Sequence, residues 1–193
     1  MKIEQWFSIP IWKTNLEIDD DTVNECIRFC LDLSMQSEGR VKTNRGGWQS
    51  NDLFYKDFIN TPLIKYFQNI ENKLAGCMKD LDSKASLSFT NSWININRNK
   101  NENYAHTHPN STLSGVFYLT DNNSSIIFTR NEDISTYFLE TINSNNNTIS
   151  SYNYVTYKPC KNDLIIFPSW LRHKVLPADS AARISVAFNT KIN

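Results

Sequence analysis

The sequence contains few of the residues that usually mark a specialised surface or an extracellular chain. Its 193 residues include only three histidines, four cysteines and five glycines, and 20 basic side chains are balanced by 20 acidic ones. With no net charge at pH 7, the chain lacks the basic footprint of a nucleic-acid-binding protein, so that class is the least favoured. No apolar run reaches the ~18 residues of a membrane-spanning helix, and the first residues lack the apolar segment of a signal peptide. We therefore expect a cytoplasmic protein with free thiols.

The hydrophobic pattern divides the chain into a helical first part and a strand-rich second part. Hydrophobic residues make up 40% of the sequence and aromatic residues 12%, enough for one domain over residues 1–193 to bury a sizeable core. From residue 86 onward, short apolar or alternating runs are separated by polar loops, as is typical of a β-sandwich or barrel. We predict mostly β structure with flanking helices, in which a helix-containing part, residues 1–85, packs on the outside of a jelly-roll core, residues 86–193.

Two helices are predicted in the first part. Asp21 is typical of a helix start, and apolar or thiol side chains then recur at helical spacing until the chain approaches Gly39. A second helix is expected to open at Thr61-Pro62, where a capping residue precedes a proline at the first helical position. Residues 130–153 are polar and are expected to form an insertion between strands.

All three histidines fall into a spacing that suits metal ligation. His106 and His108 are separated by one residue, so on a strand both imidazoles would point to the same face, and Pro109 would help to end that strand. His173 follows an apolar run at residues 164–167 and could arrive from a neighbouring strand. Imidazole suits Fe(II), Zn, Cu and Ni. These histidines are therefore the candidate metal ligands and catalytic residues, and the alternative is that they are three ordinary histidines.

A second group of polar residues could form a pocket beside the metal. Arg183 and Ser185 share one face of a strand, where the guanidinium could hold a carboxylate with two parallel hydrogen bonds and the hydroxyl could add a third. The phenol of Tyr118 could donate to the same carboxylate, and the alternating amides of Asn95 and Asn97 need partners. All five are candidate cofactor-binding residues. The alternatives are a water-exposed arginine, a core tyrosine and amides bonded to loop carbonyls.

These motifs resemble a small family of 2-oxoglutarate/Fe(II)-dependent oxygenases of bacteria and marine phages. A His-x-ligand pair, a distant third histidine and a following basic residue is the order found in such enzymes. The resemblance covers about three quarters of the chain, through Gly46-Gly47-Trp48-Gln49-Ser50, His106-Thr107-His108-Pro109, Leu113-Ser114-Gly115-Val116-Phe117-Tyr118, Phe167-Pro168-Ser169-Trp170-Leu171-Arg172-His173 and Arg183-Ile184-Ser185-Val186-Ala187-Phe188-Asn189. It implies a double-stranded β-helix, the cupin-like jelly roll, with flanking helices.

The resemblance also implies a function. The chain is expected to be a dioxygenase that hydroxylates an unidentified substrate and releases succinate and CO2. Fe(II) is expected at His106, His108 and His173, and the cosubstrate 2-oxoglutarate at Arg183. Trp48 and Gln49, which follow two glycines, are candidate substrate contacts. Loop composition does not specify the substrate, which could be a small molecule or a protein side chain.

His108 departs from the usual pattern, which is His-x-Asp/Glu followed by a distant histidine. A carboxylate would offset one charge of the metal, whereas three neutral imidazoles leave both charges in place. His108 could replace the carboxylate as a ligand, which we favour, or stand back and leave a position that solvent or chloride fills.

Two other classes of function remain open from the residues. One is a three-histidine metalloenzyme that does not use 2-oxoglutarate, either similar to thiol dioxygenases or a zinc hydrolase, in which Arg183 would hold the substrate itself. The other is a non-enzymatic jelly-roll module that binds sugar or protein. Binding of 2-oxoglutarate would distinguish an oxygenase from the three-histidine metalloenzyme. Tight metal binding would distinguish an oxygenase from the non-enzymatic binding module.

Overall fold

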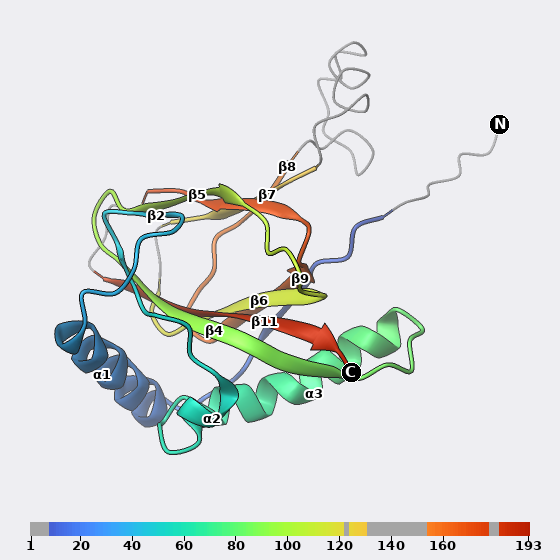
Figure 1. The fold of residues 1–193 in the computed structure, drawn as a ribbon, viewed down its shortest axis with the longest axis horizontal. Helices are drawn as coiled ribbons and strands as arrows, with labels where there is room; N and C mark the ends of the chain where they lie inside the picture. Colours follow the sequence, from blue (N-terminus) through green and yellow to red (C-terminus); the bar gives the residue numbers. More distant parts are fainter. Residues whose placement is uncertain (1–7, 122–123, 131–153, 178–181) are drawn as a thin grey trace, which may run out of the picture.

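Two antiparallel sheets face one another, and helices cover the outer side of one of them (Figure 1). This computed structural model describes residues 8–121, 124–130, 154–177 and 182–193. Along the chain the elements are β1 (Trp12–Asn15), α1 (Asp20–Gln36), β2 (Asn44–Arg45), β3 (Trp48–Gln49), α2 (Tyr55–Phe58), α3 (Ile64–Asp80), β4 (Leu87–Asn97), β5 (Glu102–His106), β6 (Leu113–Tyr118), β7 (Ile126–Thr129), β8 (Tyr154–Tyr157), β9 (Asp163–Pro168), β10 (Arg172–Val175) and β11 (Arg183–Ile192).

The strand order confirms the predicted jelly roll. The larger sheet has the order β1-β9-β6-β11-β4-β3, and the smaller sheet has the order β2-β5-β10-β7-β8. Every pair of neighbouring strands is antiparallel. Most strands that are consecutive in the chain, such as β9 and β10, belong to different sheets, so the chain passes repeatedly between the two sheets.

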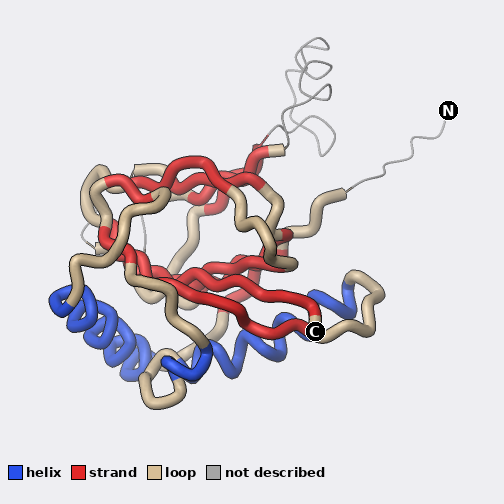
Figure 2. Tube along the Cα trace, in the orientation of Figure 1, coloured by secondary structure: helices blue, strands red, loops and turns tan. Residues whose placement is uncertain are grey.

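The larger sheet is buried on both faces, which explains its continuous apolar runs. On β6 the side chain of Phe117 joins the cluster that packs against α1 and α3, whereas Val116 and Tyr118 join a second cluster between the sheets. On β9, Ile166 and Ile165 divide in the same way. The helices therefore cover the outer face (Figure 2), and the inner face lines a cavity.

Helix α1 begins one residue before the predicted start. Asp19 is its N-cap, with Oδ1 accepting a hydrogen bond from the backbone N–H of Thr22 at 2.8 Å. Asp20 and Asp21 then occupy the first turn, where acidic side chains complement the helix dipole. The helix ends at Gln36, before the predicted stop near Gly39.

The predicted opening of the second helix at Thr61-Pro62 is wrong. The helix α3 begins at Ile64, and Thr61 does not cap it, because its hydroxyl donates to the carbonyl of Phe58 at 3.0 Å. This bond closes the short helix α2, which the sequence pattern did not predict. Residues 61–63 form the turn between the two helices, so the side chain of Thr61 bonds to the helix before it and does not cap the helix after it.

Three further expectations concern membrane-spanning helices, the cysteines and the polar insertion. Within the described residues, no helix is long and apolar enough to cross a membrane. All four cysteines are free thiols in the structure, three of them buried, as expected. Apart from Arg130, the predicted insertion at residues 130–153 lies outside the described residues.

Candidate metal centre and adjoining cavity

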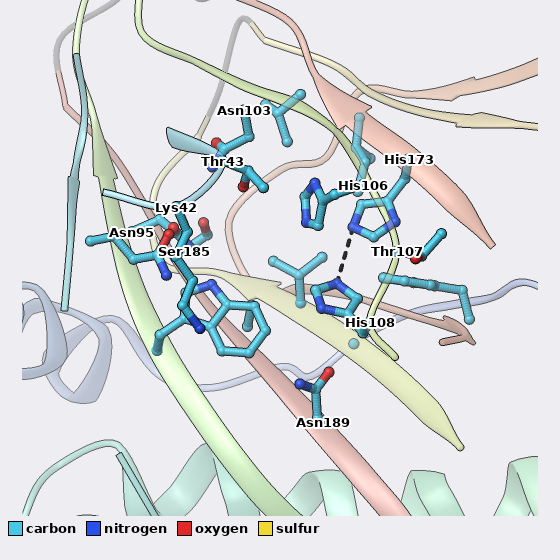
Figure 3. Close-up of a pocket in the computed structure, with 18 of the residues that line it drawn as sticks. Lys42, Thr43, Asn95, Asn103, His106, Thr107, His108, His173, Ser185 and Asn189 are labelled. Carbon is cyan, nitrogen blue, oxygen red and sulfur yellow. Dashed lines mark hydrogen bonds between the residues drawn. The ribbon is translucent and has the colours of Figure 1, made fainter. Parts of the chain in front are cut away.

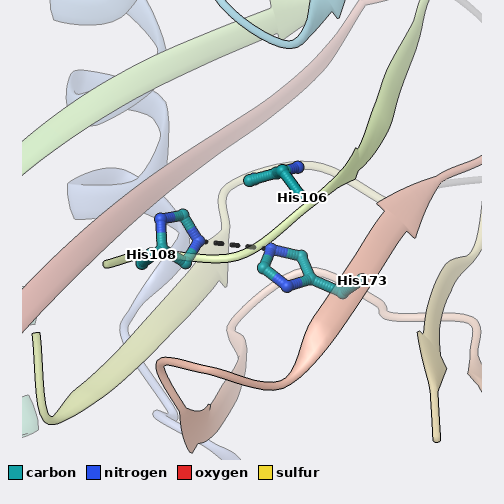
Figure 4. Close-up of side chains that lie close together, drawn as sticks. All are labelled: His106, His108 and His173. Atoms are coloured by element: carbon teal, nitrogen blue, oxygen red, sulfur yellow. Dashed lines mark hydrogen bonds between the residues drawn. The ribbon is translucent and has the colours of Figure 1, made fainter. Parts of the chain in front are cut away.

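The fold brings the three histidines to one point (Figure 4). His106 is the last residue of β5, and it is the direct cross-strand partner of His173 on β10. His108 lies two residues beyond His106, where its backbone N–H donates to the carbonyl of Ser169 at 2.8 Å. One ring nitrogen from each histidine lies within 4.8 Å of the other two. The three nitrogens are therefore spaced as ligands of a single ion.

Backbone carbonyls orient two of the rings toward that point. Nδ1 of His106 lies 2.7 Å from the carbonyl of Tyr104, and Nδ1 of His173 lies 2.9 Å from the carbonyl of Leu171. A carbonyl only accepts hydrogen bonds, so each Nδ1 carries the proton and each Nε2 keeps its lone pair for a metal. Nε2 of His108 and Nε2 of His173 face one another at 3.2 Å.

The burial of the site keeps the imidazoles in their neutral form. Burial is the main reason that the pKa of His108 falls to about 2, and the neighbouring His173 and His106 lower it further. Burial also lowers the pKa of His173 to about 3, with a further lowering from His106, while the carbonyl of Leu171 acts in the opposite direction. Neutral imidazole is the form that binds a metal, so the site is ready to bind one at neutral pH.

A cavity of about 310 Å³ adjoins the histidines between the two sheets (Figure 3). Four of its polar side chains form one row across the larger sheet. Gln49 on β3 pairs with Asn95 on β4, Asn95 pairs with Ser185 on β11, and Ser185 pairs with Tyr118 on β6. All four line the cavity, because directly paired residues share one face of a sheet. The carbonyl oxygen of the Asn95 side chain is buried without a hydrogen-bond partner among the described residues.

Arg183 lies at the start of β11 with its guanidinium in the same cavity. The residue is 3% exposed, and its Nη1 donates to the hydroxyl of Ser124 at 3.1 Å. Its Nε is buried and has no partner among the described residues. Burial lowers the pKa of Arg183, and the neighbouring Tyr118 acts in the opposite direction. No acidic side chain lines the described part of the cavity, so a guanidinium here fits an anionic ligand.

Two candidate residues from the sequence lie outside this cavity lining. The amide of Asn97 is fully buried, and its Nδ2 donates to Oδ1 of Asn103 at 2.9 Å, which bridges the ends of β4 and β5. The indole N–H of Trp48 donates to the carbonyl of Ser37 at 2.8 Å, and the ring packs against the helix-side core. The geometry therefore supports neither the expected cofactor contact of Asn97 nor the expected substrate contact of Trp48. Gln49 does line the cavity.

Sequence reasoning missed several residues of the cavity, among them Arg40, Lys42 and Asn189. Arg40 forms a two-pronged salt bridge with Asp52, with Nη1 to Oδ2 at 2.8 Å and Nη2 to Oδ1 at 2.6 Å. Its hydrogen bonds are the main cause that lowers the pKa of Asp52 to about 2, with help from Asn91 and Lys42. Arg40 and Lys42 lie in irregular chain between α1 and β2, where no periodicity could have indicated them.

A chain of hydrogen bonds connects this salt bridge to the metal centre. Asn91 donates to Asp52 at 2.8 Å, and Asn189 donates to Asn91 at 3.0 Å. The order of the whole series is Arg40, Asp52, Asn91, Asn189, Ser114 and Ser169, and the carbonyl of Ser169 accepts from His108. The wall of the cavity and the position of His108 are thus part of one network.

Comparison with known proteins identifies the family. A family model described as "Putative 2OG-Fe(II) oxygenase" matches residues 91–189, just over half of the chain, and this span contains all three histidines and Arg183. The chain belongs to this 2OG-Fe(II) oxygenase family. It is therefore an Fe(II)- and 2-oxoglutarate-dependent oxygenase, and the three histidines together could hold its metal. A search of curated proteins found no match.

Solved structures share the fold at low sequence identity. A prolyl-4-hydroxylase of Pseudomonas putida has a TM-score of 0.66 and 13% identity, covering 95% of this chain and 94% of that one. A prolyl hydroxylase of Trichoplax adhaerens, in complex with a hypoxia inducible factor peptide, has a TM-score of 0.65 and 15% identity, with coverages of 94% and 83%. HygX of Streptomyces hygroscopicus, with nickel and 2-oxoglutarate bound, has a TM-score of 0.62 and 11% identity, with coverages of 95% and 82%. These likenesses confirm the double-stranded β-helix.

Proposed function

We propose that this oxygenase hydroxylates a substrate, releases succinate and CO2, and binds iron through His106, His108 and His173. The observation that carries the proposal is the shared cavity, in which a three-histidine cluster adjoins a buried arginine without an acidic partner among the described residues. Bound Fe(II) would supply the redox chemistry that couples oxidation of 2-oxoglutarate by O2 to hydroxylation of the substrate. The residues of the chain then bind and orient 2-oxoglutarate and the substrate, and they exclude water from the site.

The far carboxylate of 2-oxoglutarate is assigned to Arg183. A buried guanidinium needs an anion, and its Nε still has a hydrogen to donate. The hydroxyl of Ser185 and the phenol of Tyr118 are cross-strand neighbours on the same wall and can donate to the same group. Burial raises the pKa of Tyr118, so its phenol keeps the proton that it would donate. Asn95 lies in the same row and can complete the polar end of this site.

Gln49 and Trp93 line the cavity and are candidate contacts for the substrate. The Trp93 ring lies 5.4 Å from the ring of His108, so it can form an apolar wall beside the metal. The related structures include an enzyme with a bound peptide and an enzyme with bound nickel and 2-oxoglutarate. By analogy with these enzymes, either a peptide side chain or a small molecule could be the substrate of this oxygenase.

Anaerobic titration of the Fe(II)-loaded protein with 2-oxoglutarate tests the proposal. We expect a saturable metal-to-ligand charge-transfer band, which is absent in His173→Ala. In Arg183→Gln the Kd for 2-oxoglutarate should rise about 30-fold or more, since loss of a buried charge pair costs about 2 to 5 kcal/mol. Arg172→Gln is the matched control, because Arg172 lies next to His173 but its side chain is exposed and lies outside the cavity lining.

The other outcomes assign the protein to the rival classes. Iron that binds without any charge-transfer band would contradict the 2-oxoglutarate site and favour a three-histidine enzyme of another kind. Failure to hold iron, with tight binding of zinc, would favour a hydrolase, and failure to bind either metal would favour a binding module. Circular dichroism of each variant separates loss of the site from loss of the fold.

A further inference from the structure

The charged side chains that line the cavity are all basic within the described residues. They are Arg40, Lys42 and Arg183. Asp52 balances Arg40 through the two-pronged salt bridge, and 2-oxoglutarate is assigned to Arg183 in the proposed function. Lys42 is left with no salt-bridge partner in the described part of the chain. Its ammonium group is exposed to solvent and forms no salt bridge there, although it lies near enough to Asp52 to help lower the pKa of that carboxyl.

The backbone that carries Lys42 is held in place by the side chain of Asn44. The backbone N–H of Lys42 donates to Oδ1 of Asn44 at 2.8 Å, while Nδ2 of Asn44 donates to the carbonyls of Arg40 at 3.1 Å and Gly47 at 2.8 Å. The backbone N–H of Arg40 also donates to the carbonyl of Gln49 at 2.8 Å, which ties the segment to β3. Hydrogen bonds thus hold the segment that carries Lys42, and Lys42 lies among the residues that line the cavity (Figure 3).

Adding the charges of the site with iron and 2-oxoglutarate bound shows an excess of positive charge. Iron bound by three neutral imidazoles keeps two positive charges, Arg183 adds one, and 2-oxoglutarate brings two negative charges. One positive charge then remains, and Lys42 adds a second. In an oxygenase with a carboxylate ligand one of these would be offset, but His108 occupies that position. A charge that is buried is costly unless it is paired, so an anionic substrate would offset the positive charge left beside the buried Arg183 and the histidines. Lys42 is exposed and solvated, and it lines the cavity where it can bind that anion.

The hydrogen-bond donors near Lys42 favour a carboxylate over a phosphate. Besides the ammonium, the Nε of Arg40 is buried and has no partner among the described residues, and the neighbouring Thr43 with its single hydroxyl also lines the cavity. Phosphate sites are built from more donors, commonly a helix N-terminus or several arginines. Among ligand cavities the volume of about 310 Å³ is small, and it must also hold 2-oxoglutarate. A small organic acid fits these limits better than a nucleotide.

We propose that the substrate is a small carboxylic acid and that Lys42 binds its carboxylate, with Nε of Arg40 as a second donor. This inference rests on the proposed function, because it assigns the other anion to Arg183. By binding the carboxylate, Lys42 would hold that end of the substrate away from the metal and direct the opposite end toward the histidines. Lys42 is in this sense a specificity residue that binds the substrate and takes no part in ligating the metal.

Ligand-observed NMR on protein loaded with zinc and saturated with 2-oxoglutarate tests the inference. Zinc is redox-inert, so binding is measured without turnover. The probes are butanoate, the uncharged butanamide and the dianion propylphosphonate, which share one aliphatic chain. We expect butanoate to bind at least tenfold more tightly than butanamide, and to bind more tightly than propylphosphonate. In Lys42→Gln the affinities for butanoate and butanamide should become equal.

Arg45→Gln is the matched control. Arg45 lies on β2, three residues from Lys42, where it bonds Glu102 at 3.4 Å and lies outside the cavity lining. Removal of this charge should leave the preference for butanoate unchanged. The inference is overturned if butanoate does not bind, if it binds no better than butanamide, if propylphosphonate binds more tightly, or if Lys42→Gln keeps the preference.

The affinity for 2-oxoglutarate, measured in the same samples, separates this inference from the proposed function. If 2-oxoglutarate binds the wild type and butanoate does not, the inference alone fails. If 2-oxoglutarate does not bind the wild type, the proposed function fails, and the inference with it. If Lys42→Gln weakens 2-oxoglutarate as much as Arg183→Gln does, Lys42 belongs to the cosubstrate site and the inference is overturned.

Discussion

His108 is the residue that most distinguishes this site from the usual metal triad of oxygenases. It stands where an aspartate or glutamate is expected, yet the fold places its Nε2 3.2 Å from Nε2 of His173, at the same point as His106. Its backbone is fixed by the carbonyl of Ser169. The geometry therefore supports a third imidazole ligand, which changes the charge of the centre without changing the number of ligands.

Two substitutions at this position test whether His108 ligates the metal. His108→Ala should weaken Fe(II) binding about tenfold or more, because even residues that only support a ligand commonly contribute 10- to 100-fold. His108→Asp should retain iron more tightly than His108→Ala, since a carboxylate restores a ligand and offsets one charge. Competition with a colorimetric iron chelator under anaerobic conditions measures both affinities. If His108→Ala holds iron as tightly as the wild type, His108 is not a ligand.

At the scale of the strand, one alternation determines both the core and the site. Along β11 the side chains of Ile184, Val186 and Phe188 pack on the helix side, while Arg183 and Ser185 face the cavity. Cross-strand pairing then extends each set over neighbouring strands, so the polar row and the apolar core lie back to back. A shift of the register by one residue would exchange the two faces and destroy both.

Gly115 on β6 provides the space that this packing needs. A Cβ at this position would lie 2.3 Å from the Phe188 ring, which is fully buried and packs edge-on against Phe89 at 5.4 Å. Gly115→Ala should therefore lower the free energy of unfolding by about 1 to 3 kcal/mol, the usual cost of overpacking. Urea denaturation measures the change.

Gly76 provides the matched control for this substitution. It lies exposed on α3, and a Cβ there would meet nothing within 4 Å. Gly76→Ala should raise the free energy of unfolding by about 0.5 to 1 kcal/mol, because alanine loses less backbone entropy than glycine in a helix. Equal stability of Gly115→Ala and the wild type would show that the Phe188 ring can move, contrary to its packing.

At the scale of the whole molecule, the metal centre joins segments that are far apart in the chain. His106 and His173 lie on paired strands of the smaller sheet, and His108 is bonded to the loop after β9, a strand of the larger sheet. Through Ser114 and Asn189 the same network reaches the larger sheet itself. The proposal that residues 1–193 form one domain remains a prediction, and these contacts are compatible with it.

The buried histidines also predict how the stability of the metal-free protein depends on pH. Burial lowers the pKa of His173 to about 3, whereas an unfolded histidine titrates near about 6.5. Between these values the unfolded state binds the proton and the folded state does not, so the free energy of unfolding falls as the pH falls below about 6.5. One such group contributes a slope of about 1.4 kcal/mol per pH unit.

Urea denaturation with a chelator present, between about pH 7 and about pH 5, measures this slope. In His173→Gln the slope should be shallower by the contribution of one histidine, because glutamine does not titrate. Asp19→Asn is a control outside the site, since its carboxyl already has a lowered pKa and is charged throughout this range. A wild-type protein that is as stable at the lower pH as at the higher one would contradict the burial of the neutral imidazoles.

Much of the local chemistry could be predicted from the sequence because it depends on short-range patterns. The i and i+2 spacing of Arg183 and Ser185 places that pair on one side of a strand whatever the rest of the chain does. His106 ends β5 and His108 lies beyond the strand, where its backbone bond to Ser169 holds it. The change from helical to alternating periodicity near residue 86 indicated the jelly roll for the same reason. The start of α3 was misplaced because Thr61 and Pro62 fit both the end of one helix and the start of the next.

What the sequence by itself determined is therefore the kind of fold, while the three histidines as metal ligands and Arg183 as the anion-binding residue are predictions from it that the geometry supports. Only the tertiary structure decided which polar residues share the cavity, since that depends on strand register and on how irregular segments pack. Asn97 and Trp48 were placed at the site by their position in the sequence, but neither lines the cavity: Asn97 bonds to Asn103, and the indole of Trp48 bonds to Ser37. Lys42 carries no signal in the sequence, and it reaches the cavity because Asn44 folds its segment back against β3.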